Sequence, residues 1–513
     1  MSRTRSFFGG AIFAYLYQAC SMVIGLWLTP FYIRTLGSND YGIWLIGMQV
    51  LVFLLLCDFG VLAVVPRDVA RAHGKEQSEA GSGELRMLIG QTIKVVGIQT
   101  VLVALVSLGV FFFRPPATAA IRGPISLALF VFVLTFPMRL FPAVLQGLQD
   151  LKFLGQLRLW MWAVSTAVSV VLLILGARFW ALACGWSLQQ IVHDLVAFRR
   201  LRRVRPDLLT AAVLKSTGPF TWRWFLRGLW VNVGQIGYGL SAGTDLLIIG
   251  RALGPATVVV YACTIKLITV LQNQPQILAS VALPGLSHLK ASEPRQQVLH
   301  KTISLTQAML VLIGGVFCVV LAVNQQFVMV WLGPKFFGGI ELTYLLLLNF
   351  LVRQIDYTLS MALFAFGYEK PLTIRTLLDG IVSFGLALIL VQHFGLVGVA
   401  IGALCGGLCV ALPTDVFLYM REFKLSFFGL LRPYAPYLWR FAVVGIAGLA
   451  FAAQFHAPNF FNLAMITTFV VLAYSLLVLP YAWRTPLRGY VEVTISALRS
   501  AMPSRILGWS ING

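Results

Sequence analysis

Tyr32-Ile33-Arg34-Thr35-Leu36-Gly37 recurs in the second half of the chain as Ile249-Gly250-Arg251-Ala252-Leu253-Gly254, each time after a long apolar segment. Self-similarity at a fixed spacing indicates that one structural unit is used twice. If each copy carries six membrane spans, an even number, both copies enter the bilayer in the same sense and leave a cleft between two lobes. Other landmarks recur at nearly the same offset: Gln18 with Gln235, Pro66 with Pro284, Gly147 with Gly367, and Gly176 with Gly395.

The composition is too apolar for a soluble globule. Of the 513 residues 59% are hydrophobic and 11% are charged, and the mean hydropathy is +0.85. Soluble domains carry about 25% charged residues. The first apolar segment follows a basic amino terminus, but its run is too long for a signal peptide and no cleavage site closes it, so we expect a retained helix.

The sequence therefore predicts an all-α, polytopic integral membrane protein with about 14 transmembrane helices of roughly 20 residues each. We expect a six-helix amino-terminal lobe over residues 1–205 and a six-helix carboxy-terminal lobe over residues 206–425. Spans thirteen and fourteen fall outside the repeat and form an accessory helix pair within residues 426–490. Residues 491–513 are expected to form a cytoplasmic tail.

The net charge of +21 is distributed as in a membrane protein. With the amino terminus inside, most of the Lys and Arg residues fall in segments predicted to be cytoplasmic, which is the positive-inside bias. The densest cluster, within residues 199–205, fits orientation in the membrane and contact with anionic lipid, or docking of a cytoplasmic partner. Nucleic acid is not an expected partner, because no aromatic platform or soluble module accompanies the charge.

No sequence motif predicts a cofactor, a catalytic residue or a metal site. All seven cysteines fall in predicted spans, and the six histidines are scattered. Neither a zinc-binding His-Glu-x-x-His pattern nor a Walker-type phosphate loop occurs in the sequence. Uphill transport would therefore depend on an ion gradient or on the concentration difference of the substrate itself.

Charged groups inside predicted spans are expensive in hydrocarbon and usually face a cavity or a partner. Arg139, Lys266 and Arg353 are three such cations, from both lobes, and together they would attract phosphate. Arg353 and Asp356 are three residues apart on one helix, so they either pair with each other or Asp356 aligns Arg353 toward an anion. Asp194 and Asp415 occupy matching places near the ends of spans six and twelve.

Other polar residues in the spans suggest a lining for a hydroxyl-rich substrate. Asp58 and Asp245 could neutralise a buried cation or carry a proton or sodium ion. A polar stripe at helical spacing inside a bilayer marks a wet surface or an interhelical seam. The predicted glycan-binding residues are Gln18, Asn232, Gln235, Gln272 and Asn273.

Four segments carry a family resemblance. Leu28-Thr29-Pro30-Phe31-Tyr32-Ile33-Arg34-Thr35-Leu36-Gly37-Ser38-Asn39-Asp40-Tyr41-Gly42-Ile43-Trp44, with Cys57-Asp58-Phe59-Gly60-Val61 after it, resembles the opening of the polysaccharide transporter family. Gly243-Thr244-Asp245-Leu246-Leu247-Ile248-Ile249-Gly250 and Phe394-Gly395-Leu396-Val397-Gly398-Val399-Ala400 are similar to later parts of it. This family belongs to the multidrug, oligosaccharidyl-lipid and polysaccharide exporter superfamily, and the similarity covers essentially the whole chain.

The resemblance implies a flippase of the bacterial inner membrane with both termini in the cytoplasm. Such proteins move an undecaprenyl-diphosphate-linked repeat unit to the periplasmic leaflet for assembly of O-antigen in lipopolysaccharide, of capsule or of exopolysaccharide. The implied partners are the lipid-linked oligosaccharide and membrane lipids, with a polysaccharide polymerase and a chain-length regulator as further candidates.

Two other functions stay open at this point. A multidrug or cation antiporter of the same superfamily would share the fold, although a cationic cleft disfavours cationic drugs. A membrane-embedded polymerase or ligase would need a sizeable periplasmic loop, and the longest outside segment, residues 325–340, is short. We therefore expect a transporter and not an enzyme.

Overall fold

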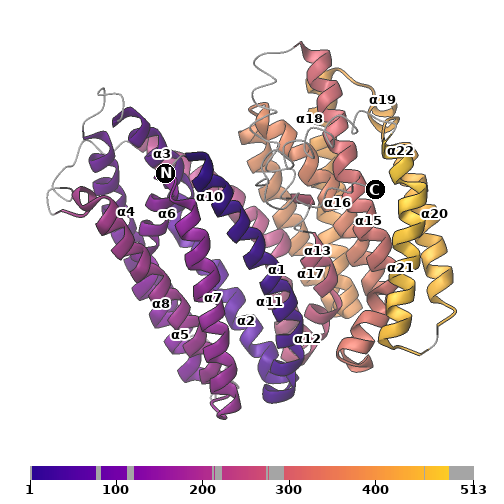
Figure 1. Ribbon diagram of the computed structural model, residues 1–513, viewed down its shortest axis with the longest axis horizontal. Coiled ribbons are helices and arrows are strands. Elements are labelled where there is room, and N and C mark those ends of the chain that lie inside the picture. Colours follow the sequence, from indigo (N-terminus) through magenta and orange to yellow (C-terminus); the bar gives the residue numbers. More distant parts are fainter. Residues whose placement is uncertain are drawn as a thin grey trace, which may run out of the picture. The chain divides into compact units, whose positions relative to one another are not determined.

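The computed structural model describes residues 3–76, 83–112, 121–210, 213, 222–272, 275–276, 294–455 and 457–483, with side chains from residue 12 in the first helix and mostly from residue 226 in the helix that begins at residue 222. All regular secondary structure in these ranges is helical (Figure 1). The predicted all-α class is confirmed.

Nine helices in the described part of the chain are long and apolar enough to cross a membrane. One of them, Glu369–Phe423, covers two predicted spans, which separate at Gly395, where φ is 57°. Glycine accepts this left-handed conformation without a steric penalty. The polytopic architecture is thus confirmed, while the count of about 14 spans stays a prediction. The spans are Ile12–Leu36, Ser38–Asp58, Glu84–Phe112, Arg122–Gly147, Leu151–Ile174, Arg295–Trp331, Glu369–Phe423, Ala435–Ala452 and Phe460–Trp483.

The chain divides into two compact units, Met1–Val259 and Val260–Gly513. The first unit includes helices that follow the repeat boundary expected near residue 205, because α10 packs against α3 and η1, and α11 packs against α2. Glycines permit this close approach: a Cβ on Gly60 would lie 2.3 Å from the carbonyl oxygen of Gly228. The predicted lobe boundaries themselves stay predictions.

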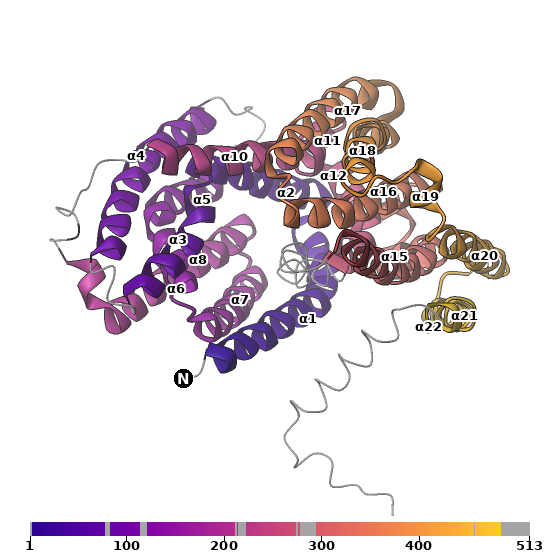
Figure 2. The ribbon, with the colours of Figure 1, turned by 90° about the horizontal axis from the view of Figure 1, so that it is seen from above.

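The helices of the first unit surround a core that includes Val69, Val96, Phe136 and Leu145. Figure 2 shows α1 beside α7 and α7 near α8, and these are among its most extensive helix pairs. Its elements are α1 (Arg3–Leu36), α2 (Ser38–Leu54), η1 (Leu55–Asp58), α3 (Val61–Glu76), α4 (Glu84–Phe112), α5 (Arg122–Thr135), η3 (Phe136–Arg139), α6 (Leu140–Gly147), α7 (Leu151–Ile174), α8 (Phe179–Val204), η4 (Pro206–Leu209), α10 (Trp222–Ala242) and α11 (Asp245–Ala252), and α12 (Pro255–Thr264) crosses into the second unit.

In the second unit the helices α20 and α21, which lie within the range predicted for the accessory pair, pack against α15 (Figure 1). The rings of Phe441 and Tyr474 stack with centroids 5.9 Å apart, and Gly314 leaves room for Phe441 on α15. The elements are α13 (Lys266–Leu271), α15 (Arg295–Trp331), η5 (Pro334–Phe336), α16 (Ile340–Ala365), α17 (Glu369–Gly406), η6 (Gly407–Ala411, a π-helix), α18 (Leu412–Phe423), α19 (Phe427–Leu431), α20 (Ala435–Ala452), α21 (Phe460–Leu477) and α22 (Leu479–Trp483).

Candidate functional site

The first unit contains a polar cavity of about 640 Å³ between α2, η1, η3 and α10. Its polar lining residues are Gln49, Asp58, Arg139, Gln235 and Tyr238. Three of these, Asp58, Arg139 and Gln235, are residues that the sequence predicted for the site, and the structure brings them together from three separate elements. The volume lies in the range of about 300–1,000 Å³ that is typical of ligand sites.

Asp58 reaches this cavity because the helix breaks there. The α-helix α2 tightens into the 3₁₀ turn η1, and then Phe59 and Gly60 adopt φ values of 47° and 69°. The amide of Gly60 donates to Asp58 Oδ1 at 2.7 Å, and Gln99 Nε2 donates to the carbonyl oxygen of Asp58 at 2.7 Å. Broken backbone at membrane depth is tolerated where its polar groups are satisfied in this way.

Arg139 also lies at a helix break, at the end of the 3₁₀ turn η3, which contains Pro137. It is half-buried, and its side chain makes neither a hydrogen bond nor an ion pair with any described residue. Asp58 and Asp194 are the carboxylates whose charges act on it. Arg139 is thus a cation that lines a cavity and whose hydrogen-bond donors are not used by the described part of the protein.

The polar stripe on α10 divides between the cavity and the protein interior. Gln235 and Tyr238 are exposed and line the cavity. Asn232 is buried, its amide oxygen has no hydrogen-bond partner among the described residues, and it does not line the cavity. Gln49 on α2 was missed by the sequence analysis, because it is a single polar residue within an apolar run. The structure shows that it lines the cavity opposite α10.

Arg353 in the second unit is engaged by three groups. Its guanidinium donates to Asp379, to Ser383 Oγ at 3.3 Å and to the carbonyl oxygen of Ala403 at 2.9 Å. The suggested pairing of Arg353 with Asp356 is wrong. Both residues lie on α16, but α16 packs against α17, so groups on the facing helix reach them first.

Asp356 instead pairs with Arg375 of α17, whose Nη1 lies 2.6 and 2.7 Å from the two carboxylate oxygens. Arg375 also donates to Ser360 Oγ at 2.9 Å, and its Nε lies 3.4 Å from Asp415 Oδ1. Ser360 donates in turn to the other oxygen of Asp415. One buried arginine therefore links two buried carboxylates on two other helices.

Arg375 was missed by the sequence analysis. It lies near the start of α17, where a cation is ordinarily expected to reach the membrane surface. The structure buries its side chain to 8% exposure instead. The available signal was the excess of aspartates in spans ten to twelve, which require buried cations as partners.

The other predicted residues are dispersed. Lys266 is half-buried at the start of α13, and the carbonyl oxygen of Gln272 accepts from Gln354 Nε2 at 3.4 Å. Gln18 is half-buried on α1, and Asp245 begins α11. None of these four lines the 640 Å³ cavity. Asn273 lies outside the described residues. The three-cation site with Arg139, Lys266 and Arg353 includes residues of both units and stays a prediction.

The helical architecture and the polar cavity define a polytopic membrane transporter. A sequence model of the polysaccharide biosynthesis protein family matches residues 8–290, more than half of the chain. The chain belongs to this family, which confirms the resemblance. It is a multi-pass membrane transporter of polysaccharide biosynthesis and not an enzyme.

Individual proteins resemble the chain more distantly. The membrane protein EpsK of Bacillus subtilis (strain 168), described as uncharacterized, is 23% identical over 418 residues, which are 77% of this chain and 79% of EpsK. The lipid II flippase MurJ in an inward closed conformation has a TM-score of 0.64 at 12% identity, covering 92% of this chain and 99% of MurJ. An inward-facing multidrug resistance transporter of the MATE family has a TM-score of 0.58 at 15% identity, covering 77% and 93%. At these identities the structures share the fold.

Proposed function

We propose that this protein is a flippase that moves an undecaprenyl-diphosphate-linked oligosaccharide from the cytoplasmic to the periplasmic leaflet of the bacterial inner membrane by alternating access. The observation that carries this proposal is Arg139, a cation that lines a cavity of about 640 Å³ and has no hydrogen-bond or ion-pair partner among the described residues. Membership of the polysaccharide biosynthesis family and the fold shared with a lipid II flippase support it.

In this proposal Arg139 binds the diphosphate, because a guanidinium can donate two parallel hydrogen bonds to phosphate oxygens. Gln49 and Gln235 provide amide donors and acceptors for sugar hydroxyls, and the exposed ring of Tyr238 provides a surface for a sugar face. In this proposal the isoprenoid chain stays in the lipid.

Asp58 is the group that would make binding reversible. When the cavity is empty, its carboxylate balances part of the charge of Arg139. An arriving diphosphate brings further negative charge, which favours uptake of a proton by Asp58. Asp58 is therefore our candidate for coupling. Arg353, predicted to bind substrate, and Asp356, predicted as an ion-coupling group or charge partner, are reassigned to structural ion pairing.

The proposed function is tested in cells depleted of the protein and complemented with wild type or with Arg139→Gln. Lipid-linked oligosaccharides are measured by mass spectrometry, and their leaflet is assigned by access of a periplasmic glycosidase. We expect Arg139→Gln to accumulate the complete repeat unit on the cytoplasmic side. Transport should fall at least about tenfold, because a hydrogen bond to a charged group contributes about 1.5–3 kcal/mol.

Arg122→Gln is the matched control, because Arg122 is exposed at the start of α5 and does not line the cavity. It should transport as well as wild type. Normal transport by Arg139→Gln at equal membrane abundance would remove Arg139 from the site, and unchanged lipid-linked sugars in depleted cells would refute the flippase.

A second candidate function is export of an organic cation. Asp58 and Tyr238 line the same cavity, and a carboxylate with an aromatic face can bind a cation. New sensitivity of depleted cells to cationic toxins, with unchanged lipid-linked sugars, would favour this function.

A further inference from the structure

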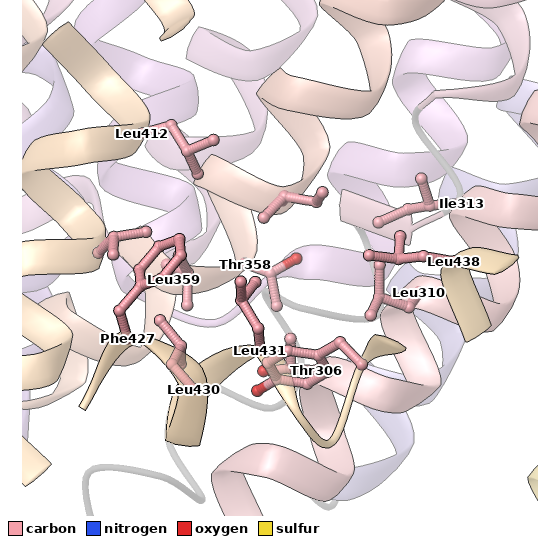
Figure 3. A pocket seen from close by; sticks show the side chains of 13 residues that line it. Thr306, Leu310, Ile313, Thr358, Leu359, Leu412, Phe427, Leu430, Leu431 and Leu438 are labelled. Atoms are coloured by element: carbon pink, nitrogen blue, oxygen red, sulfur yellow. The ribbon is translucent and has the colours of Figure 1, made fainter. Parts of the chain in front are cut away.

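A second pocket lies in the second unit, between α15, α16 and α18 on one side and α19 and α20 on the other. Its volume is about 200 Å³, below the range of about 300–1,000 Å³ expected for drug-sized ligands. Figure 3 shows its lining side chains around a common space, among them Leu310, Ile313, Leu359 and Leu412. Phe427 and Leu430 of the short helix α19 close one side.

The two threonines in this lining do not make it polar. Thr306 Oγ1 donates to the carbonyl oxygen of Thr302 at 3.0 Å, and Thr358 Oγ1 donates to that of Gln354 at 2.9 Å. Hydroxyls that donate to a carbonyl oxygen of their own helix do not need a ligand to accept their hydrogen bond. Apart from the buried hydroxyl of Tyr434, the lining is therefore apolar. Apolar cavities of about 150 Å³ stay dry and accept apolar guests.

Cations flank the segment that closes the pocket. Lys424 precedes α19 and Arg432 follows it, and both are exposed. Their side chains make no hydrogen bond or ion pair with any described residue. The exposed rings of Phe427 and Phe428 lie between them in sequence, with 50% and 82% of their surface accessible. An apolar slot, aromatic rings and unpaired cations are the combination that matches a lipid at the membrane interface.

We propose that this pocket binds one acyl chain of an anionic phospholipid, whose phosphate is held by Lys424 and Arg432. Charge complementarity selects the anionic headgroup, and the size of the pocket admits part of a single chain. The lipid would hold α19 against α15, α16 and α18. Because this end of the unit is basic, the positive-inside rule assigns it to the cytoplasmic leaflet. The site is independent of the transport cavity and does not rest on the proposed function.

The experiment is native mass spectrometry of the purified full-length protein after exchange into nanodiscs that contain phosphatidylglycerol, phosphatidylcholine or undecaprenyl phosphate. Wild type should retain one phosphatidylglycerol with at least tenfold preference over phosphatidylcholine. Leu438→Trp places a bulky ring at the rim, where Leu438 is 37% exposed, and should reduce retention at least tenfold. Lys424→Gln combined with Arg432→Gln should abolish the preference but leave weak binding of both phospholipids.

Leu312→Trp is the matched control for the bulky substitution. Leu312 is 41% exposed on α15 but does not line the pocket, so this variant should bind phosphatidylglycerol like wild type. Size-exclusion chromatography of each variant establishes that it is folded. Equal retention by Leu438→Trp and wild type, equal retention of the two phospholipids by wild type, or stronger retention of undecaprenyl phosphate would each overturn the proposal.

Discussion

The two units place arginine and aspartate at helix irregularities in similar ways but use them differently. In the first unit Asp58 and Arg139 are the last residues of 3₁₀ turns and line an open cavity, and Arg139 has no hydrogen-bond or ion-pair partner among the described residues. In the second unit Arg353 contacts the backbone beside a π-helix, and Asp379 and Ser383 bind its remaining donors. The difference lies in whether a facing helix supplies a counter-charge. Only the first arrangement leaves a donor free for substrate.

The matching aspartates near the ends of the two repeats show the same contrast. Asp415 is fully buried and contacts both Ser360 and Arg375. Asp194 is equally well buried, but its Oδ1 contacts His193 at 2.8 Å and its Oδ2 has no hydrogen-bond partner among the described residues. The second unit thus holds an ion-paired carboxylate where the first unit holds one that contacts a histidine.

The largest expected effect is that of removing the cation at the centre of the second network. Arg375→Leu leaves Asp356 and Asp415 buried without a counter-charge, which typically costs about 3–5 kcal/mol. We expect a large fall in folded protein, measured by fluorescence-detected size-exclusion chromatography after heating. The control is Arg178→Leu, since Arg178 pairs with Asp40 at 3.4 Å on the surface and such pairs contribute about 0–1 kcal/mol. Equal thermal stability of the two variants would contradict a structural role for Arg375.

A smaller effect distinguishes the two arginines that the sequence grouped together. Arg353→Gln leaves Asp379, with a side chain only 3% exposed, without its cation and should cost about 1–3 kcal/mol. Arg139→Gln removes no hydrogen bond or ion pair with a described residue, so it should change stability by less than about 1 kcal/mol while transport falls at least about tenfold. Thermal stability and transport of both variants are measured side by side. A stable, transport-deficient Arg353→Gln would restore Arg353 to the substrate site.

These assignments show how far the sequence could lead. Long apolar runs predicted helices such as α4 and α15, because spanning a bilayer requires them. Asp58, Arg139 and Gln235 were found because polar residues within predicted membrane spans are expensive in hydrocarbon and usually have a function. The partner of each charge was not predictable, since spacing within α16 cannot reveal what α17 places opposite it. Gln49 and Arg375 acquire their roles only through tertiary packing.

The smallest expected effect concerns a second network in which one arginine pairs with two carboxylates, but here the three side chains are partly exposed to water. Arg205, directly after α8, contacts Glu76 at 3.1 Å and Asp207 at 2.9 Å, with side chains 21%, 19% and 28% exposed. The hydrogen bond from Arg205 is the main cause that lowers the pKa of Asp207, and the same contact raises the pKa of Arg205. Solvent screening limits the contribution of such a pair to about 1 kcal/mol or less.

The sign of this contribution sets its pH dependence. Because the pKa of Asp207 is lower in the folded state than its unfolded value of about 3.9, its stabilisation is complete above that value and is lost as the pH falls through the folded pKa. Thermal stability of wild type and Asp207→Asn should therefore differ slightly at neutral pH and converge in acid. If the difference in thermal stability between wild type and Asp207→Asn stayed constant as the pH falls, Asp207 would act through packing. The contrast between the surface network and the buried network would then not depend on charge.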